Sequence, residues 1–144
     1  MRYFNCHTHT FNMQYVPDGF LGYRMNMRVA KMVNAVMRTE WGAKAIMKTI
    51  KPFLGPQGKK TLAFLSIGLK KTQDMVFEEL IAKYPKDDDA RFIILPLNFQ
   101  YMGVGELHIS YQQQLADLFE VKKKYPNKCF PFVSVDARMG NSDY

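Results

Sequence analysis

Continuous apolar runs, rather than alternating ones, divide this chain into short segments. Residues 92–97 and most of 128–135 are apolar without interruption, which is the pattern of a strand buried on both faces of a parallel sheet. Residues 62–67 form a similar run, and the N-terminal residues also read as a short strand. We therefore predict four strands, over residues 1–11, 61–68, 91–99 and 128–135.

Between these runs, apolar residues recur at the three- and four-residue spacing of amphipathic helices. The predicted helices cover residues 24–50, 72–84 and 110–124. Ser110 and Gln113 fit a capping box at the start of the last helix. The tripeptide Lys-Tyr-Pro ends both later helices, at 83–85 and 124–126. This repeated order of helix and strand predicts an α/β fold with parallel strands, in which residues 24–51 are a helical insertion after the first strand.

Composition narrows the class of protein. The chain has 144 residues, 47% of them hydrophobic and 23% charged, so we assign residues 1–144 to one globular domain. The net charge is +7, but the basic residues are spread along predicted helices without a nucleic-acid-binding motif, and we expect no nucleic-acid partner. Cys6 and Cys129 give no disulfide framework. No leader or apolar run of transmembrane length is present, so we expect a cytoplasmic protein without a membrane partner.

Two histidines, His7 and His9, stand two residues apart at the end of the first predicted strand. Side chains alternate along a strand, so we expect both imidazoles on one face together with Asn5, and Cys6 and Thr8 on the other. Two imidazoles that converge at a strand end can share a divalent metal ion. The alternative is a pair of hydrogen-bonded histidines without a metal.

Three segments together are similar to a known family. Residues 5–11 (Asn-Cys-His-Thr-His-Thr-Phe), 101–105 (Tyr-Met-Gly-Val-Gly) and 130–138 (Phe-Pro-Phe-Val-Ser-Val-Asp-Ala-Arg) resemble the amidohydrolase superfamily, in its amidohydrolase-related, decarboxylase-like branch. Relatives often carry Asp-Pro-Arg where residues 136–138 read Asp-Ala-Arg. The resemblance implies a TIM-type (β/α)8 barrel. Four strands make about half of such a barrel, so the resemblance implies a truncated chain that holds the N-terminal half.

The resemblance also implies roles for particular residues. His7 and His9 would be ligands of one divalent metal ion, with zinc expected first, and the further ligands would lie beyond Tyr144. No lysine ends the fourth predicted strand, which favours a mononuclear site. Asp136 and His108 can be nominated as a third ligand, although a loop or surface role is the simpler interpretation of each. Arg138 can hold a substrate carboxylate, and a structural ion pair is its alternative.

The family chemistry implied here is metal-dependent hydrolysis of a C–N or C–O bond in a small-molecule substrate. A nonoxidative decarboxylase of the same superfamily is the first alternative. A non-catalytic fragment or interaction module is the second, because an open half-barrel has unpaired edges that favour association into a homo-oligomer. Whether these 144 residues form an active enzyme stays open at the level of the sequence.

Overall fold

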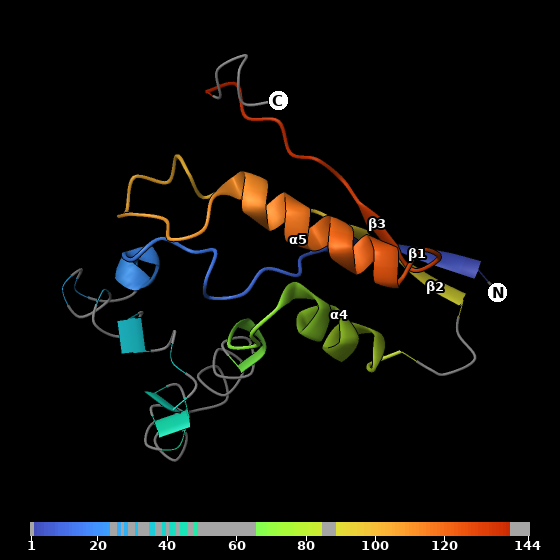
Figure 1. Cartoon of the computed structure of the whole chain (residues 1–144), viewed down its shortest axis with the longest axis horizontal. Helices are drawn as coiled ribbons and strands as arrows, with labels where there is room; N and C mark the ends of the chain where they lie inside the picture. Colours follow the sequence, from blue (N-terminus) through green and yellow to red (C-terminus); the bar gives the residue numbers. More distant parts are fainter. Residues whose placement is uncertain are drawn as a thin grey trace.

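A computed structural model describes residues 2–23, 26, 28, 31, 35–36, 39, 41–42, 44–45, 48, 66–84 and 89–138 of the chain (Figure 1). Its elements, in chain order, are β1 (Arg2–Thr8), the 3-10 helix η1 (Phe20–Tyr23), α4 (Gln73–Ile81), β2 (Asp89–Ile94), α5 (Tyr111–Lys124) and β3 (Cys129–Pro131). No helix of the described residues is long and apolar enough to cross a lipid bilayer.

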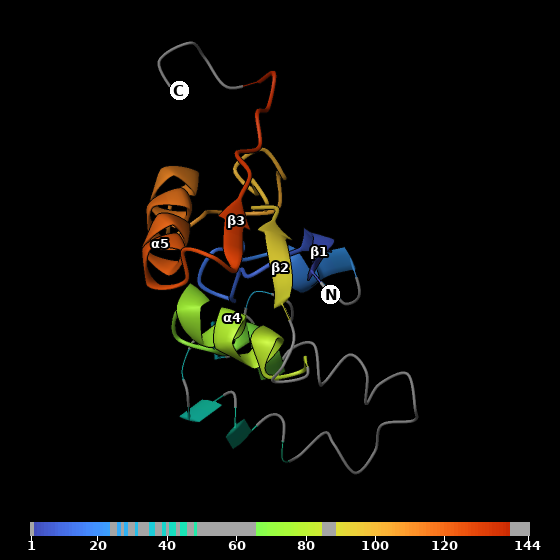
Figure 2. The same cartoon turned by 90° about the vertical axis from the view of Figure 1, so that its right-hand side faces the viewer.

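The three strands form a parallel sheet in the order β1-β2-β3. Figure 2 shows them side by side, with α4 and α5 packed next to them. The α/β class with parallel strands is therefore confirmed for the described residues. In the chain, α4 lies between β1 and β2 and α5 lies between β2 and β3, so a helix stands in each connection between parallel neighbours.

One hydrophobic cluster holds both helices against one face of the sheet. Phe77 of α4 and Leu118 of α5 are fully buried, and their partners come from the strands and α5. The cluster consists of Phe77, Ala90, Phe92, Ile94, Leu118, Val121 and Cys129. Because alternate residues of β2 enter it, the intervening residues of β2 must point to the opposite face of the sheet.

That opposite face is only partly covered. Phe4 is 48% exposed, and the Arg91 guanidinium lies 5.7 Å from its ring and 6.0 Å from the ring of Phe130. These cation–π contacts shield the charge that β2 places there. Nε of Arg91 is buried and has no hydrogen-bond partner within the described part of the chain. The described sheet is thus covered by helices on one face and only partly covered on the other.

The first residues of α5 are capped by a side chain, whereas those of α4 are not. The Ser110 side chain accepts a hydrogen bond from the backbone N–H of Gln113 at 3.1 Å, so the predicted N-cap of α5 is confirmed. The reciprocal half of the capping box is absent, because the Gln113 amide donates to Asp117 instead. Thr72 stands at the N-cap of α4 without a capping hydrogen bond, since its hydroxyl donates to the side chain of Asp74.

The prediction of a strand over residues 61–68 is wrong where the structure describes it. Residues 66–68 are helical, and residues 61–65 lie outside the described residues. The sheet explains the error, because β1 pairs directly with β2 and leaves no position between them. Apolar content alone does not tell a buried strand from a buried helical turn. Gly68 instead accepts a hydrogen bond from the backbone N–H of Met13, in the loop after β1.

The other predicted strands are shorter than expected. β1 ends at Thr8 and β2 at Ile94. The last strand, predicted to continue to residue 135, ends at Pro131, and one further ladder bond joins Phe132 N–H to the Ile94 carbonyl at 2.9 Å. Beyond that point the chain runs away from the sheet (Figure 1). A complete barrel is not shown, and the insertion predicted over 24–51 falls largely outside the described residues.

Candidate metal-binding histidine pair

A bulge in β1 decides which way the two histidines point. Asn5 pairs with Phe92 and Thr8 pairs with Ile94, so three steps of β1 match two steps of β2. The extra residue brings Asn5 and Thr8 to the same face. Accordingly, Asn5 donates from its amide to the Tyr84 hydroxyl on the helix side, at 2.8 Å. The prediction that Asn5 shares a face with the two histidines is therefore wrong.

Beyond the bulge, the alternation of faces is regular again. Thr8 and Thr10 are buried, whereas His7 is exposed and His9 is half-buried. Oδ1 of Asn5 also accepts a hydrogen bond from the backbone N–H of His7 at 3.2 Å. This contact between two residues of β1 stabilises the bulge. His7 and His9 consequently lie on one face of the chain, as predicted, and opposite to the buried threonines.

The imidazoles of His7 and His9 approach each other through their Nε2 atoms. Nε2 of His9 lies 3.2 Å from Nε2 of His7, and the ring planes are nearly perpendicular, at 89°. Nδ1 of His9 lies 2.6 Å from the backbone carbonyl of Leu95, the residue after β2. A carbonyl oxygen can only accept a hydrogen bond, so Nδ1 of His9 carries the hydrogen. In the neutral ring, Nε2 then has no hydrogen and keeps a free lone pair. Leu95 is itself fixed to β1, because its N–H donates to the Thr8 carbonyl at 2.8 Å.

This geometry fits a shared metal ion. Nitrogens bound at about 2.0–2.1 Å to one tetrahedral zinc ion lie roughly 3.3–3.4 Å apart, close to the 3.2 Å between the two Nε2 atoms. The contact of His9 Nδ1 with the Leu95 carbonyl fits as well, because a metal-binding imidazole often donates its other N–H to a backbone carbonyl. The alternative arrangement has the same separation: His7 Nε2–H would donate to the Nε2 lone pair of His9. The two arrangements differ in whether His7 Nε2 carries a proton.

The nominated third ligands lie elsewhere. His108 contacts Asp18, with 3.0 Å between Nε2 and Oδ1. Asp136 forms an ion pair with Arg138, with 2.6 Å between Oδ2 and Nη2. Among the residues that the structure describes, no group of three or more His, Cys, Asp and Glu side chains is arranged to hold a metal. The nominations of His108 and Asp136 therefore find no support among the described residues, and metal binding by His7 and His9 stays a prediction.

Arg138 forms a structural ion pair with Asp136, which was the predicted alternative to binding a substrate carboxylate. Its Nε and Nη2 both donate to the Asp136 carboxylate, its Nη1 donates to the Tyr101 carbonyl, and its guanidinium stacks 4.8 Å from the Tyr101 ring. The Arg138 side chain, and then its backbone N–H, hold the pKa of Asp136 at about 2. Recognition of a substrate carboxylate by Arg138 stays a prediction, and it would require exchange of this partner.

Sequence reasoning missed the residue that orients His9. The Leu95 carbonyl is a backbone group, so the type of side chain at position 95 carries no signal for it. The ring of Phe11 lies 6.5 Å from that of His9 and 5.5 Å from that of Phe99, and the Phe99 ring also contacts Phe20. These aromatic rings form an apolar wall beside the half-buried histidine.

Comparison of the chain with protein-family models, curated proteins and solved structures finds no match. The histidine pair and the parallel α/β sheet that carries it are therefore the features that bear on function.

Proposed function

We propose that His7 and His9 bind a divalent metal ion, with zinc expected first, as part of a metal-dependent hydrolase of the amidohydrolase type. The observation that carries the proposal is the pair of Nε2 atoms 3.2 Å apart, with the second nitrogen of His9 held by the Leu95 carbonyl. The Leu95 carbonyl leaves a lone pair on His9 Nε2, and the metal site further requires that His7 Nε2 carry no proton.

The position of the pair in the fold supports this proposal. His7 lies near the carboxyl end of β1 and His9 follows it. In α/β folds with parallel strands, binding and catalytic residues gather at the carboxyl ends of the strands. The half-open face of the sheet, with Phe4 and Arg91, is consistent with a barrel that further strands would close. The remaining protein ligands would then come from residues outside the described ranges or from another chain.

Bound at this pair, zinc supplies Lewis-acid activation of a water molecule or of a substrate carbonyl. The residues of this chain contribute orientation and shielding. The Leu95 carbonyl keeps the proton of neutral His9 on Nδ1, and the ring of Phe11 places apolar surface 6.5 Å from the ring of the half-buried His9. Two protein ligands leave coordination positions for a further ligand, for water and for substrate, as catalytic sites require. The bond that such a site would hydrolyse is a C–N or C–O bond.

The first test is zinc content, measured by mass spectrometry after dialysis of the purified chain against zinc and then against buffer. The wild-type chain is expected to retain zinc, and the His7→Ala/His9→Ala variant is expected to lose it. His108→Ala is the matched control, because it removes the third histidine of the chain from its contact with Asp18. Equal zinc in the wild type and the double variant, or none in either, would reject the metal site.

Two further measurements connect the metal to chemistry. The ¹⁵N shifts of the imidazoles report whether His7 Nε2 carries a proton, and the proposal expects both Nε2 shifts to move on addition of zinc. Hydrolysis of p-nitrophenyl acetate and p-nitroacetanilide, with and without zinc, is expected to gain a zinc-dependent component that the double variant lacks and His108→Ala keeps. Zinc binding without that component would reject the hydrolase and keep the metal site.

A further inference from the structure

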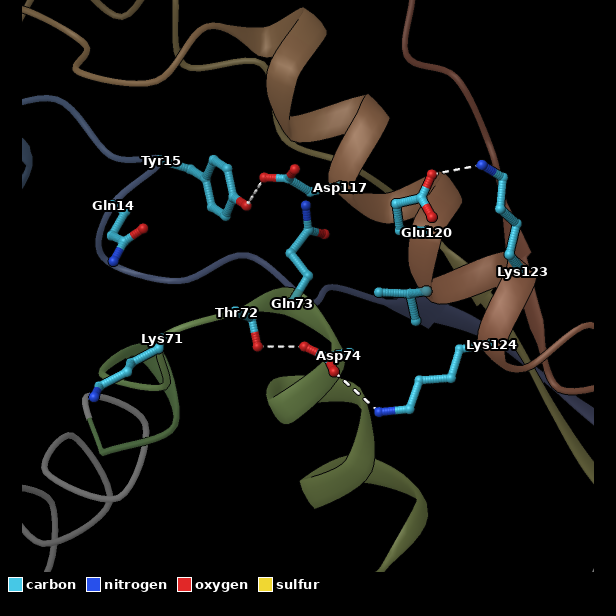
Figure 3. Close-up of a pocket in the computed structure, with 11 residues that line it drawn as sticks. Gln14, Tyr15, Lys71, Thr72, Gln73, Asp74, Asp117, Glu120, Lys123 and Lys124 are labelled. Atoms are coloured by element: carbon cyan, nitrogen blue, oxygen red, sulfur yellow. Dashed lines mark hydrogen bonds and ion pairs between the residues drawn. The ribbon is translucent and has the colours of Figure 1, made fainter.

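A cavity of about 560 Å³ lies between the start of α4, the middle of α5 and the loop after β1 (Figure 3). Neither His7 nor His9 lines it, so it is separate from the histidine pair. The residues that line it are Gln14, Tyr15, Lys71, Thr72, Gln73, Asp74, Asp117, Glu120, Val121, Lys123 and Lys124. Its volume is in the range of pockets that hold small organic molecules.

Buried polar side chains hold one wall of this cavity in place. Gln73 is 3% exposed, accepts the Thr10 hydroxyl at 3.0 Å and donates to the Gln114 carbonyl at 2.7 Å. Tyr15 is 4% exposed, and its hydroxyl donates to Oδ2 of Asp117 at 2.5 Å. Burial, and then the hydrogen bond to Asp117, raise the pKa of Tyr15 above its usual value. The phenol therefore stays protonated and keeps donating.

The lysines at the α5 side of the cavity already have anionic partners. Nζ of Lys123 lies 2.6 Å from the Glu120 carboxylate. Nζ of Lys124 lies 3.0 Å from Asp74 and 2.7 Å from Glu78, a partner outside the lining. The hydrogen bonds that Lys124 donates to these two carboxylates, Glu78 first, raise the pKa of Lys124. The Lys123 side chain is largely exposed and that of Lys124 is about half exposed.

Asp117 differs from the other carboxylates of the lining. It accepts the Tyr15 hydroxyl on one oxygen and the Gln113 amide on the other, at 2.9 Å, and both donors are neutral. Within the described part of the chain, Asp117 makes no ion pair with a lysine, arginine or histidine. An ionised carboxylate offers about four acceptor positions, and two of these are used. The carboxylate is thus fixed in direction, and its charge has no cationic partner among the residues that the structure describes.

We propose that this cavity binds a small organic cation whose ammonium group donates hydrogen bonds to Asp117. An ammonium group supplies the charge and the donors that Asp117 lacks, and charge-assisted hydrogen bonds of this kind are about twice as strong as neutral ones. The Tyr15 and Gln113 contacts order the carboxylate before the ligand arrives, which reduces the entropy lost on binding. This inference is independent of the proposed metal site.

The test uses 1,4-diaminobutane as the probe and 1,4-butanediol as a neutral probe of the same length, with binding followed by amide chemical shifts of the full chain. The diamine is expected to move the resonances of Tyr15 and Gln73, and the diol to bind at least tenfold more weakly. Asp117→Asn keeps the size of the side chain and should weaken the diamine roughly tenfold or more. Glu79→Gln makes the same change in net charge outside the cavity, at a residue paired with Lys70 and Lys83, and should leave affinity within twofold.

A second variant distinguishes the effect of the Asp117 charge from the effect of its hydrogen-bond donor. Tyr15→Phe removes one donor that orders the carboxylate but keeps its charge, so it should weaken diamine binding less than Asp117→Asn does. Circular dichroism of each variant confirms that it is folded. Equal affinity of wild type and Asp117→Asn, equal binding of diamine and diol, or shifts at the cavity with inorganic phosphate and none with the diamine would each overturn the proposal.

Discussion

Phe77 is the largest fully buried side chain of α4. It is fully buried, and its ring lies 5.7 Å from that of Phe92 in β2 and 5.2 Å from that of Tyr125 after α5. Phe77→Ala removes burial worth about 2–3 kcal/mol and two aromatic contacts worth roughly 1 kcal/mol each. The expected loss of unfolding free energy is about 4 kcal/mol, within the range for such truncations.

The assay is urea denaturation followed by far-UV circular dichroism. With a slope of about 2 kcal/mol per M, the midpoint should fall by roughly 2 M, and the slope should not change. Phe119→Ala is the matched control, because this phenylalanine of α5 is 44% exposed and should cost about 1 kcal/mol or less. Equal midpoint shifts for the two variants would show that Phe77 is not a core residue of the folded chain and would refute the packing described here.

Two further predictions follow from the titratable groups. Burial raises the pKa of the Cys129 thiol to about 11, so at pH 8 Ellman's reagent should modify Cys6, which is exposed, and should reach Cys129 only in denaturant. The pKa of Asp136, about 2 beside Arg138, lies below its value in the unfolded chain. The ion pair should therefore stabilise the fold above about pH 4 and lose this effect as pH falls towards 2. A carboxyl ¹³C titration should show that low pKa, and Arg138→Gln should raise it towards the ordinary value.

Local sequence signals found the parts of the fold whose causes are local. The continuous apolar run that includes Phe92 and Ile94 predicts a strand buried in a parallel sheet, and β2 is the central strand. Ser110 predicts the start of α5, because an N-cap acts on an amide only three residues away. The spacing of His7 and His9 predicts that both imidazoles share a face, and the two Nε2 atoms do converge.

Predictions that depended on contacts between residues far apart in the sequence were less successful. The run before Gly68 has the composition of a strand, but only the pairing of β1 with β2 shows that no place exists for it between them. Asn5 was assigned to the wrong face, because a bulge depends on the register with a neighbouring strand and leaves no trace in the alternation of a single sequence. Arg138 could be read as a ligand-binding residue or as an ion pair until its contacts with Asp136 were seen.

The sequence by itself indicated the segments of the three observed strands and of α4 and α5, the cap of α5 and the histidine pair, since each follows from residues a few positions apart. The tertiary structure alone decided the carbonyl that orients His9 and the cavity beside α5. Leu95 is 86 residues from His9, and Tyr15 is 102 residues from Asp117. Contacts over such separations form only when the sheet and helices pack, so no local pattern encodes them.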